Sequence, residues 1–291
     1  MPKIAGMDTV ALPDGRTRWP VLGLGTWRLG EHSRRRSAEV AAVRLALDLG
    51  YRLIDTAEMY GDGGAEEVVG AAIAQALRDG VCRREDLVVV SKVLPTNASR
   101  RGVAEACDRS RKRLGLDRID VYLLHWPGPH PLGETVAAFE ALQSLGHIGA
   151  WGVSNFDLAA MQRLLALPGG AACATNQVCY SLGARGIDFD LLPWQRARSM
   201  PVMAYCPIDQ GTLAREPRLA PIASRLGCSA AQIALAWTLR GGGVVAIPKA
   251  VRAEHLRDNL AAAPLRLDTA TLQALDALFP PPRSVQPLAM V

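Results

Sequence analysis

The sequence predicts a closed (β/α)8 barrel, and three observations support this fold class. Eight short apolar segments of strand type alternate with helical patterns, which is typical of a parallel sheet covered by helices. The chain has 291 residues, a length that suits a single barrel. Polar, titratable residues end several of the strands, on the face where barrels build their active sites. The predicted strands are 21–24, 53–55, 88–92, 121–125, 150–153, 174–177, 202–205 and 244–247.

The segments around these strands complete the expected barrel. Residues 9–12 and 17–19 predict a hairpin across the turn 13–16, and we expect it to plug the bottom of the barrel. A long loop, 209–221, follows the seventh strand. No linker divides the chain, so we expect one domain over residues 1–291. Helical patterns cover residues 38–49, 65–78, 100–114, 133–146, 157–167, 190–199, 229–240, 252–262 and 269–278.

Composition and local patterns exclude several classes of protein. No apolar run is long enough for a membrane span, and the N-terminus lacks a signal-peptide pattern, so we expect a cytoplasmic protein. The net charge is only +5, and its basic stretches lack interleaved aromatic residues, which disfavours nucleic-acid binding. The six cysteines contain no CxxC pair, which predicts neither a metal site nor disulfides. Residues 23–28 do not complete a G-x-G-x-x-G pattern, so a Rossmann site is disfavoured.

Three consecutive predicted strands end on titratable residues: Asp55, Lys92 and His125. Tyr60 lies in the loop after Asp55. A tyrosine hydroxyl is a weak acid, and a nearby lysine ammonium lowers its pKa. An aspartate would keep the lysine charged, and a neutral histidine can donate a hydrogen bond to a carbonyl oxygen. Any one of these residues alone is more often a cap or an ion-pair partner, but together they predict a site that protonates a carbonyl oxygen.

The second half of the chain predicts what attacks the carbonyl carbon. Ser154 and Asn155 follow the fifth strand and Gln177 ends the sixth, so amide-binding groups reach the same face as the titratable cluster. These groups suit the carboxamide of a nicotinamide ring. Tyr205 offers a flat face for stacking, and Lys249 lies near the strands where barrels often hold phosphate. The set indicates a dinucleotide cofactor.

Several separated segments of the chain resemble motifs of the aldo-keto reductase family. They are residues 50–61, 90–92, 123–127, 151–156, 176–177 and 247–249, they occur in the family's order, and the match spans essentially the whole chain. Within the family, the resemblance is strongest to small bacterial members, which include methylglyoxal and other aldehyde reductases. The resemblance implies NAD(P)H-dependent reduction of small or aromatic aldehydes and ketones to alcohols.

The resemblance also implies residue roles. Tyr60 would be the general acid, Lys92 would lower its pKa, Asp55 would support Lys92, and His125 would orient the substrate carbonyl. NADPH would lie extended across the barrel mouth, and no metal is implied. The implied cofactor contacts are Gly25, Thr26, Trp27, Asp55, Ser154, Asn155, Gln177, Tyr205, Cys206, Pro207, Ile208, Gln210, Gly211, Lys249, Ala250, His255, Asp258 and Asn259; the implied substrate contacts are Trp27, Tyr60, His125 and Trp126.

The chain departs from the family pattern near the cofactor. Ala250 and His255 replace a common serine and arginine, Asp258 replaces a glutamate, and Cys206 replaces a serine. These changes leave NADH possible, although Lys249, together with Arg252 and Arg257, favours the extra phosphate of NADPH. The tail after Pro282 is short, so we expect little material to cap the substrate pocket.

Two alternative functions remain open from the residues alone. Lys92 at a strand end could form a Schiff base in a barrel lyase. The chain could instead be a cofactor-sensing, non-catalytic subunit. For the reductase, we expect a small carbonyl substrate as the partner, without nucleic acid or membrane. We expect a monomeric chain, with a weak oligomer as the alternative.

Overall fold

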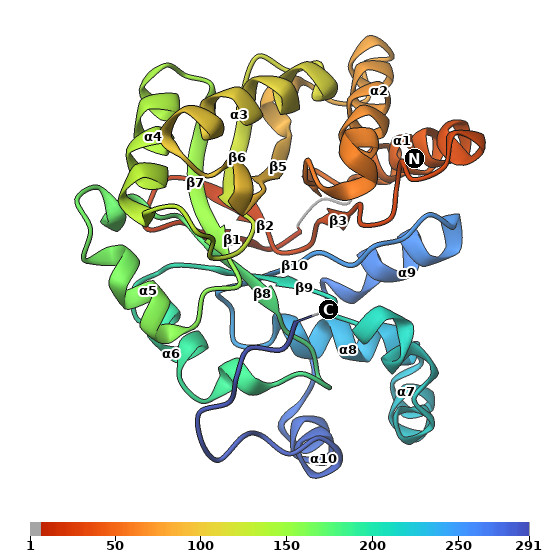
Figure 1. Cartoon of the computed structure of the whole chain (residues 1–291). Coiled ribbons are helices and arrows are strands. Elements are labelled where there is room, and N and C mark those ends of the chain that lie inside the picture. Colours follow the sequence, from red (N-terminus) through yellow and green to blue (C-terminus); the bar gives the residue numbers. More distant parts are fainter. Residues whose placement is uncertain (1–6, 291) are drawn as a thin grey trace.

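A ring of eight parallel strands forms the centre of the structure, a computed structural model that describes residues 7–290 (Figure 1). Its strands are β3 (Leu24–Gly25), β4 (Leu53–Asp55), β5 (Val88–Val93), β6 (Ile119–Leu124), β7 (Ile148–Ser154), β8 (Asn176–Cys179), β9 (Val202–Tyr205) and β10 (Val244–Ala246). They pair in chain order, and parallel bridges from Leu22 to Ala246 and from Gly25 to Lys249 close the ring. The predicted (β/α)8 fold is confirmed.

Helices surround the strand ring (Figure 1). They are α1 (Arg36–Leu49), α2 (Gly64–Arg78), α3 (Arg100–Leu114), α4 (Leu132–Ser144), α5 (Leu158–Leu165), α6 (Leu191–Arg196), α7 (Ala220–Leu226), α8 (Ala230–Leu239), α9 (Ala253–Ala262) and α10 (Thr269–Leu278). The short helix α7 was not predicted separately. Pro221 lies in its first turn, where a backbone N–H would have no partner within the helix, so a proline costs no hydrogen bond there.

The N-terminal hairpin closes the bottom of the barrel. Its strands β1 (Thr9–Ala11) and β2 (Arg18–Pro20) pair antiparallel. Val10 and Trp19 belong to one apolar cluster with barrel residues that include Leu53 and Val121. The predicted hairpin is therefore confirmed. Residues 1–6, at the start of the segment that lacks a signal-peptide pattern, lie outside the described residues.

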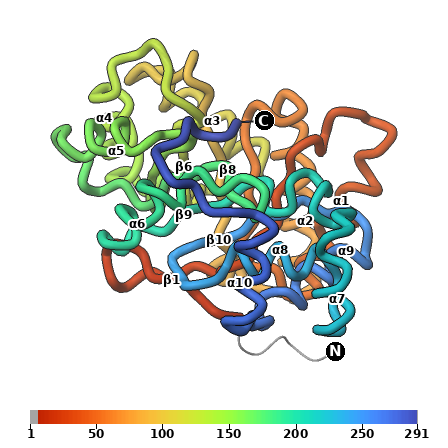
Figure 2. The backbone as a smooth tube through the Cα atoms, turned by 90° about the horizontal axis from the view of Figure 1, so that it is seen from below, coloured from red at the N-terminus to blue at the C-terminus, as the bar shows by residue number. Residues whose placement is uncertain are grey.

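The C-terminal tail runs from α10 to the barrel mouth, and its end lies over the centre of the ring (Figures 1 and 2). The carbonyl oxygen of Ala289 lies 3.5 Å from the Tyr205 hydroxyl. Met290 lines the cavity at the mouth. A short tail can reach the mouth because an extended chain covers about 3.3 Å per residue.

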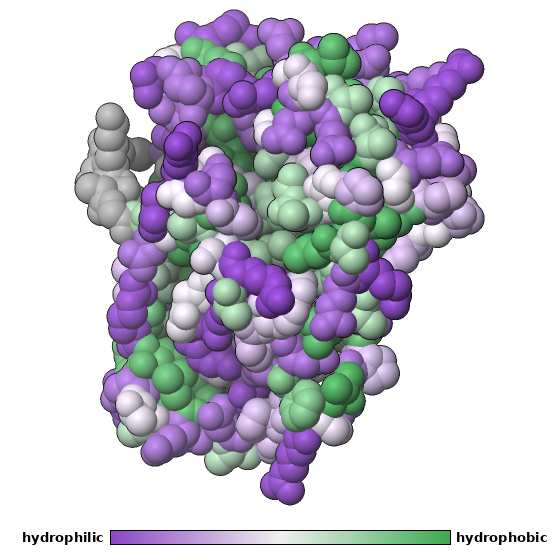
Figure 3. Space-filling view, turned by 90° about the vertical axis from the view of Figure 1, so that its left-hand side faces the viewer, coloured by the Kyte–Doolittle hydropathy of each residue, from purple (hydrophilic) through white to green (hydrophobic). Residues whose placement is uncertain are grey.

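Among the described residues, no single helix is long and apolar enough to cross a membrane. The segments Pro217–Leu226 and Ala230–Leu239 reach that length and composition only together, and they are bent by 84°. On the face shown in Figure 3, hydrophilic and hydrophobic residues are interspersed.

Two helical glycines should respond oppositely to alanine. A Cβ on Gly70 in α2 would lie 2.5 Å from the Leu114 carbonyl oxygen of α3, so Gly70→Ala should destabilise the fold by about 1–3 kcal/mol. A Cβ on Gly133 in α4 would meet no atom within 4 Å, so Gly133→Ala should stabilise it by up to about 1 kcal/mol. Urea unfolding of both variants measures the changes, and a Gly70→Ala variant that is no less stable than the wild type would contradict the close packing of α2 on α3.

Candidate active site

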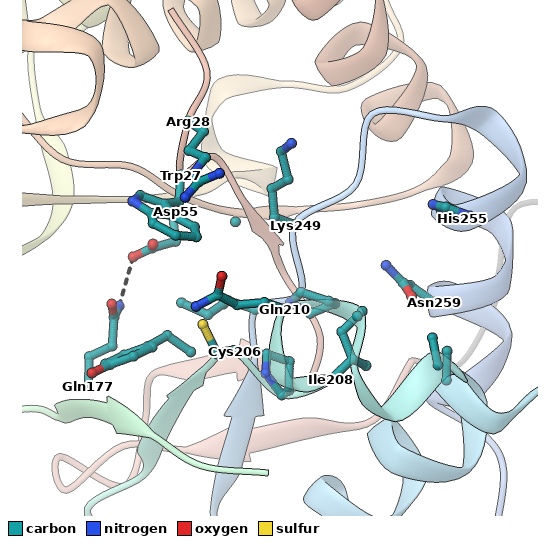
Figure 4. Close-up of a pocket in the computed structure, with 18 of the residues that line it drawn as sticks. Trp27, Arg28, Asp55, Gln177, Cys206, Ile208, Gln210, Lys249, His255 and Asn259 are labelled. Carbon is teal, nitrogen blue, oxygen red and sulfur yellow. Dashed lines mark hydrogen bonds between the residues drawn. The ribbon is translucent and has the colours of Figure 1, made fainter. Parts of the chain in front are cut away.

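The C-terminal ends of the strands open into a cavity of about 970 Å³. Figure 4 shows Trp27, Asp55 and Gln177 at one end and His255 and Asn259 at the other. The predicted site residues that line it are Gly25, Trp27, Asp55, Tyr60, His125, Trp126, Ser154, Asn155, Gln177, Tyr205, Cys206, Pro207, Ile208, Gln210, Gly211, Lys249, His255, Asp258 and Asn259.

Three predicted site residues do not line the cavity. The Thr26 side chain is fully buried, and its hydroxyl donates to the Asp55 carbonyl oxygen at 2.9 Å. Ala250 is also buried. Lys92 lies behind the cavity wall with no exposed surface, and its ammonium reaches Tyr60 from that side.

The Lys92 ammonium donates three hydrogen bonds. Its acceptors are Asp55 Oδ2 at 2.9 Å, the Thr56 carbonyl oxygen at 2.8 Å and Tyr60 Oη at 3.2 Å. An ammonium has three protons, so each one has an acceptor. Burial by itself would lower the pKa of Lys92, but the charges and hydrogen bonds of Asp55 and Tyr60 outweigh it and raise that pKa. The side chain is therefore a cation at neutral pH.

Asp55 is held from two sides. Its Oδ2 accepts from Lys92, and its Oδ1 accepts from Gln177 Nε2 at 2.7 Å (Figure 4). Gln177 was predicted to face a carboxamide. Its amide nitrogen donates to Asp55 and also to Met203 Sδ at 2.9 Å, so only its Oε1 remains for a ligand.

Tyr60 is a protonated phenol in this setting. Burial raises its pKa above the usual value near 10, and Lys92 opposes that rise. The effect of Lys92 on the pKa of Tyr60 has the predicted sign, and burial outweighs it. A phenol that keeps its proton next to a cation can give the proton up to an acceptor in the cavity.

An unusual turn presents Tyr60 to Lys92. After Tyr60, the residues Gly61, Asp62 and Gly63 have φ angles of 58°, 53° and 87°. Glycine adopts this left-handed region without steric cost, which explains two glycines at these positions. A Cβ on Gly61 would lie 2.7 Å from the Gly30 carbonyl carbon, so the turn packs directly on the loop after β3.

His125 faces Tyr60 as a neutral ring. Burial, and then the positive charge of Lys92, lowers the pKa of His125 to about 2. The two rings meet edge to face with their centroids 5.7 Å apart. Nδ1 of His125 is buried and has no hydrogen-bond partner among the described residues. A neutral imidazole can donate one hydrogen bond from a ring nitrogen.

Next to this cluster, Asn155 links two elements of the cavity wall. Its φ angle is 60°; its Oδ1 accepts from Tyr205 Oη at 2.9 Å, and its Nδ2 donates to the His125 carbonyl oxygen at 3.2 Å. Ser154 Oγ donates to the Gln177 carbonyl oxygen at 2.8 Å. These bonds fix the polar groups predicted to face a nicotinamide.

The remainder of the cavity is rich in cations. Arg28, Arg215, Lys249 and Arg252 line it, whereas its carboxylates are Asp55, which Lys92 neutralises, and Asp258. An excess of positive charge fits the phosphates of a dinucleotide. Lining residues that the site prediction did not include are Arg28, Met59, Ala214, Arg215, Ser229, Ala231, Ile247, Pro248 and Met290. Arg28 could have been found from its place beside Trp27, over whose ring its guanidinium lies at 4.4 Å.

Arg252 and Arg257 differ, although both were expected to favour a phosphate. Arg252 lines the cavity and contacts His255, whereas Arg257 does not line the cavity. No group of three or more His, Cys, Asp or Glu residues within residues 7–290 could hold a metal ion.

Comparisons with known proteins agree with this geometry. Residues 21–279 match the model of the aldo/keto reductase family. The chain is 48% identical to the methylglyoxal reductase YeaE of Escherichia coli K12, over 95% of this chain and 97% of the relative. It is 33% identical to the methylglyoxal reductase DkgB of Salmonella typhimurium, over 92% and 96%. A crystal structure of an aldo-keto reductase from Klebsiella pneumoniae in complex with NADPH has a TM-score of 0.92 and 46% identity, and the match covers 98% of this chain and 100% of that one.

The neutral His125 should make the fold sensitive to acid. The unfolded chain protonates this histidine below a pKa of about 6.5, whereas the folded chain does not until about pH 2, so stability is lost as the pH falls through that window. In the His125→Gln variant, the unfolded chain cannot bind a proton at this position. From about pH 7 to 5, the unfolding free energy of the wild type should therefore fall more steeply than that of the variant, by up to about 1.4 kcal/mol per pH unit. Equal slopes in urea titrations would contradict a neutral, buried His125.

Proposed function

Because the chain belongs to the aldo/keto reductase family, we propose that it reduces methylglyoxal and other small or aromatic aldehydes, with Tyr60 as the proton donor. The chain is an NADPH-dependent carbonyl reductase. The observation that carries the assignment of Tyr60 is its contact with the fully buried, charged Lys92 at the wall of a cavity with an excess of cations.

The proposed reaction divides the work between the cofactor and the protein. Bound NADPH supplies a hydride to the carbonyl carbon of the substrate. Tyr60 donates its phenolic proton to the carbonyl oxygen, on which negative charge develops. Lys92 lies beside the phenolate that remains and stabilises its charge, and Asp55 keeps Lys92 in place.

His125 would orient the carbonyl without carrying a charge. Its Nδ1 is buried, so Nε2 is the ring nitrogen that can donate to the carbonyl oxygen. A charged imidazolium beside Lys92 would compete with Tyr60 for the role of acid, and the low pKa of His125 prevents this. Trp27 and Trp126 would form apolar walls around the substrate.

The cofactor would extend from Tyr205 to His255. Ser154, Asn155 and the free oxygen of Gln177 would hold the nicotinamide carboxamide, with the Tyr205 ring below it. Lys249 and Arg252 would bind phosphate at the other end of the cavity, where His255 and Asn259 also lie. Location in the cytoplasm and a monomeric state stay predictions.

A Schiff-base lyase is disfavoured by the state of Lys92. A lysine that forms a Schiff base needs an accessible, unprotonated nitrogen. Lys92 has no exposed surface, its pKa is raised, and all three of its protons are donated within the protein. A cofactor-sensing subunit would share the cofactor site, and the failure of every aldehyde as a substrate despite tight NADPH binding would favour it.

Tyr60→Phe should reduce kcat for methylglyoxal by at least about 100-fold, because it removes the proton donor. The ring itself remains, so the Kd of NADPH, measured by fluorescence, should change by no more than about twofold. Turnover is followed by NADPH absorbance. A variant with nearly normal kcat would refute the role of Tyr60.

Arg252→Ala should weaken NADPH selectively. A charged hydrogen bond to a phosphate contributes about 1.5–3 kcal/mol, so even a partly exposed contact predicts a Kd for NADPH about tenfold higher. The Kd of NADH should be unchanged. Arg252 directly precedes α9, and Arg257→Ala, within that helix but outside the cavity, is the matched control. Equal effects of Arg252→Ala on both cofactors would argue against a phosphate contact at this residue.

A further inference from the structure

An ion pair between a buried carboxylate and a partly buried guanidinium lies behind the candidate active site and has no direct contact with the cavity. Glu66, in the first turn of α2, has no exposed surface. Its Oε2 accepts from Arg113 Nε of α3 at 2.6 Å, and its Oε1 accepts from Ser91 Oγ of β5 at 2.5 Å. Removing the Glu66 charge from water costs several kcal/mol, so this ion pair is weak evidence for stability. Its contacts indicate another role.

The contact of Glu66 with Ser91 connects the ion pair to Lys92. Ser91 directly precedes Lys92 in β5, and consecutive side chains of a strand point to opposite faces. Lys92 therefore faces the interior of the barrel, while Ser91 faces α2 and Glu66. The hydrogen bond from Ser91 fixes the strand to α2 at the residue next to Lys92.

The contact of Glu66 with Arg113 connects the ion pair to Tyr60. A Cβ on Gly63 would lie 2.5 Å from Nε and 2.6 Å from Cδ of Arg113, so the arginine lies directly on the backbone of the turn that carries Tyr60. On its other side, the turn packs on Gly30, whose N–H donates to Glu39 Oε2 at 2.8 Å.

This turn needs such support from both sides. Its three left-handed residues include Asp62, for which the conformation is costly. Strained backbone of this kind persists only where the surrounding structure holds it.

We propose that the Glu66–Arg113 ion pair positions Tyr60 and Lys92 relative to each other for proton transfer, a role that rests on the proposed function of those two residues. The Glu66 carboxylate contacts β5, the strand that carries Lys92, through Ser91. Through Arg113 and Gly63 it also supports the turn that carries Tyr60. The 3.2 Å contact between Tyr60 Oη and Lys92 Nζ joins exactly these two parts. Glu66 and Arg113 are positioning residues, since neither lines the cavity.

The test replaces the pair as a unit. Arg113→Met alone would leave Glu66 buried without its partner and could unfold the protein, so the main variant is Glu66→Gln/Arg113→Met. It retains an acceptor for Ser91 and does not change the net charge. Since a misplacement of 1 Å can cost about 100-fold, kcat for methylglyoxal should fall about 10–100-fold. The Kd of NADPH should stay within about twofold of the wild type.

The matched control is Arg84→Met. Arg84 forms an ion pair of 2.8 Å with Asp120, whose Oδ2 also accepts from Val89 N. This pair holds the same strand, β5, but at its opposite end. Arg84→Met should lower stability while leaving kcat within about twofold of the wild type. An equal loss of kcat in both variants would overturn the proposal, because it would show a general effect of loosening β5.

A second readout does not depend on turnover. The ¹³C resonance of the tyrosine Cζ reports ionisation, the chain has five tyrosines, and Tyr60→Phe identifies the signal of Tyr60. The groups that act on Tyr60 are Lys92, Asp55, Cys206 and the facing ring of His125. If the pair positions Lys92 beside Tyr60, the titration midpoint of Tyr60 should rise by at least about half a pH unit in the double variant. It should not move in Arg84→Met.

The two readouts separate the possible failures. Wild-type protein that reduces no aldehyde would refute the proposed function, while the Tyr60 titration would still decide the positioning role. A double variant with wild-type kcat and a wild-type Tyr60 midpoint would overturn the positioning role while leaving the proposed function intact.

Discussion

The charge of Lys92 is buried where water cannot solvate it, and its three hydrogen bonds are the constraint on which the site depends. An unpaired ammonium in this position would cost several kcal/mol. Its acceptors come from Asp55 at the end of β4, the following Thr56 backbone, and Tyr60 in the next turn. The end of β4, the Tyr60 turn and β5 must therefore meet around one nitrogen atom, and this fixes the distance between the proton donor and the cation that supports it.

The barrel satisfies this constraint through parallel register and then uses the same charge a second time. Asp55 pairs with Val90, two residues before Lys92, so the two side chains reach the same end of the ring. Gln177 is far from Asp55 in the chain, but it donates a hydrogen bond to the other carboxylate oxygen from the opposite side of the barrel. The positive charge of Lys92 also helps to keep His125 neutral. The same buried cation thus supports Tyr60 as the acid and keeps His125 a neutral hydrogen-bond donor.

The sequence predicts features that depend on local pattern. β-Branched runs predicted the strands, and strand-end positions brought Asp55 and His125 to one cavity. It could not predict that burial would outweigh Lys92 in setting the pKa of Tyr60, because desolvation depends on the finished packing. It also gave no sign of the path of the tail to Met290, or of the contact between Glu66 and Arg113, which are 47 residues apart. Such contacts follow from how helices pack on the ring.

The most direct measurement is the protonation state of Lys92, observed by ¹H–¹⁵N NMR of side-chain nitrogens in protein labelled with ¹⁵N-lysine. The chain has only four lysines, and Lys92→Met identifies the signal in question. The account predicts an ammonium with slowly exchanging protons that remains charged above the ordinary pKa of about 10.5. A Lys92 nitrogen that is already a neutral amine near pH 7 would contradict it, because an uncharged lysine could neither bind all three acceptors nor stabilise a phenolate at Tyr60.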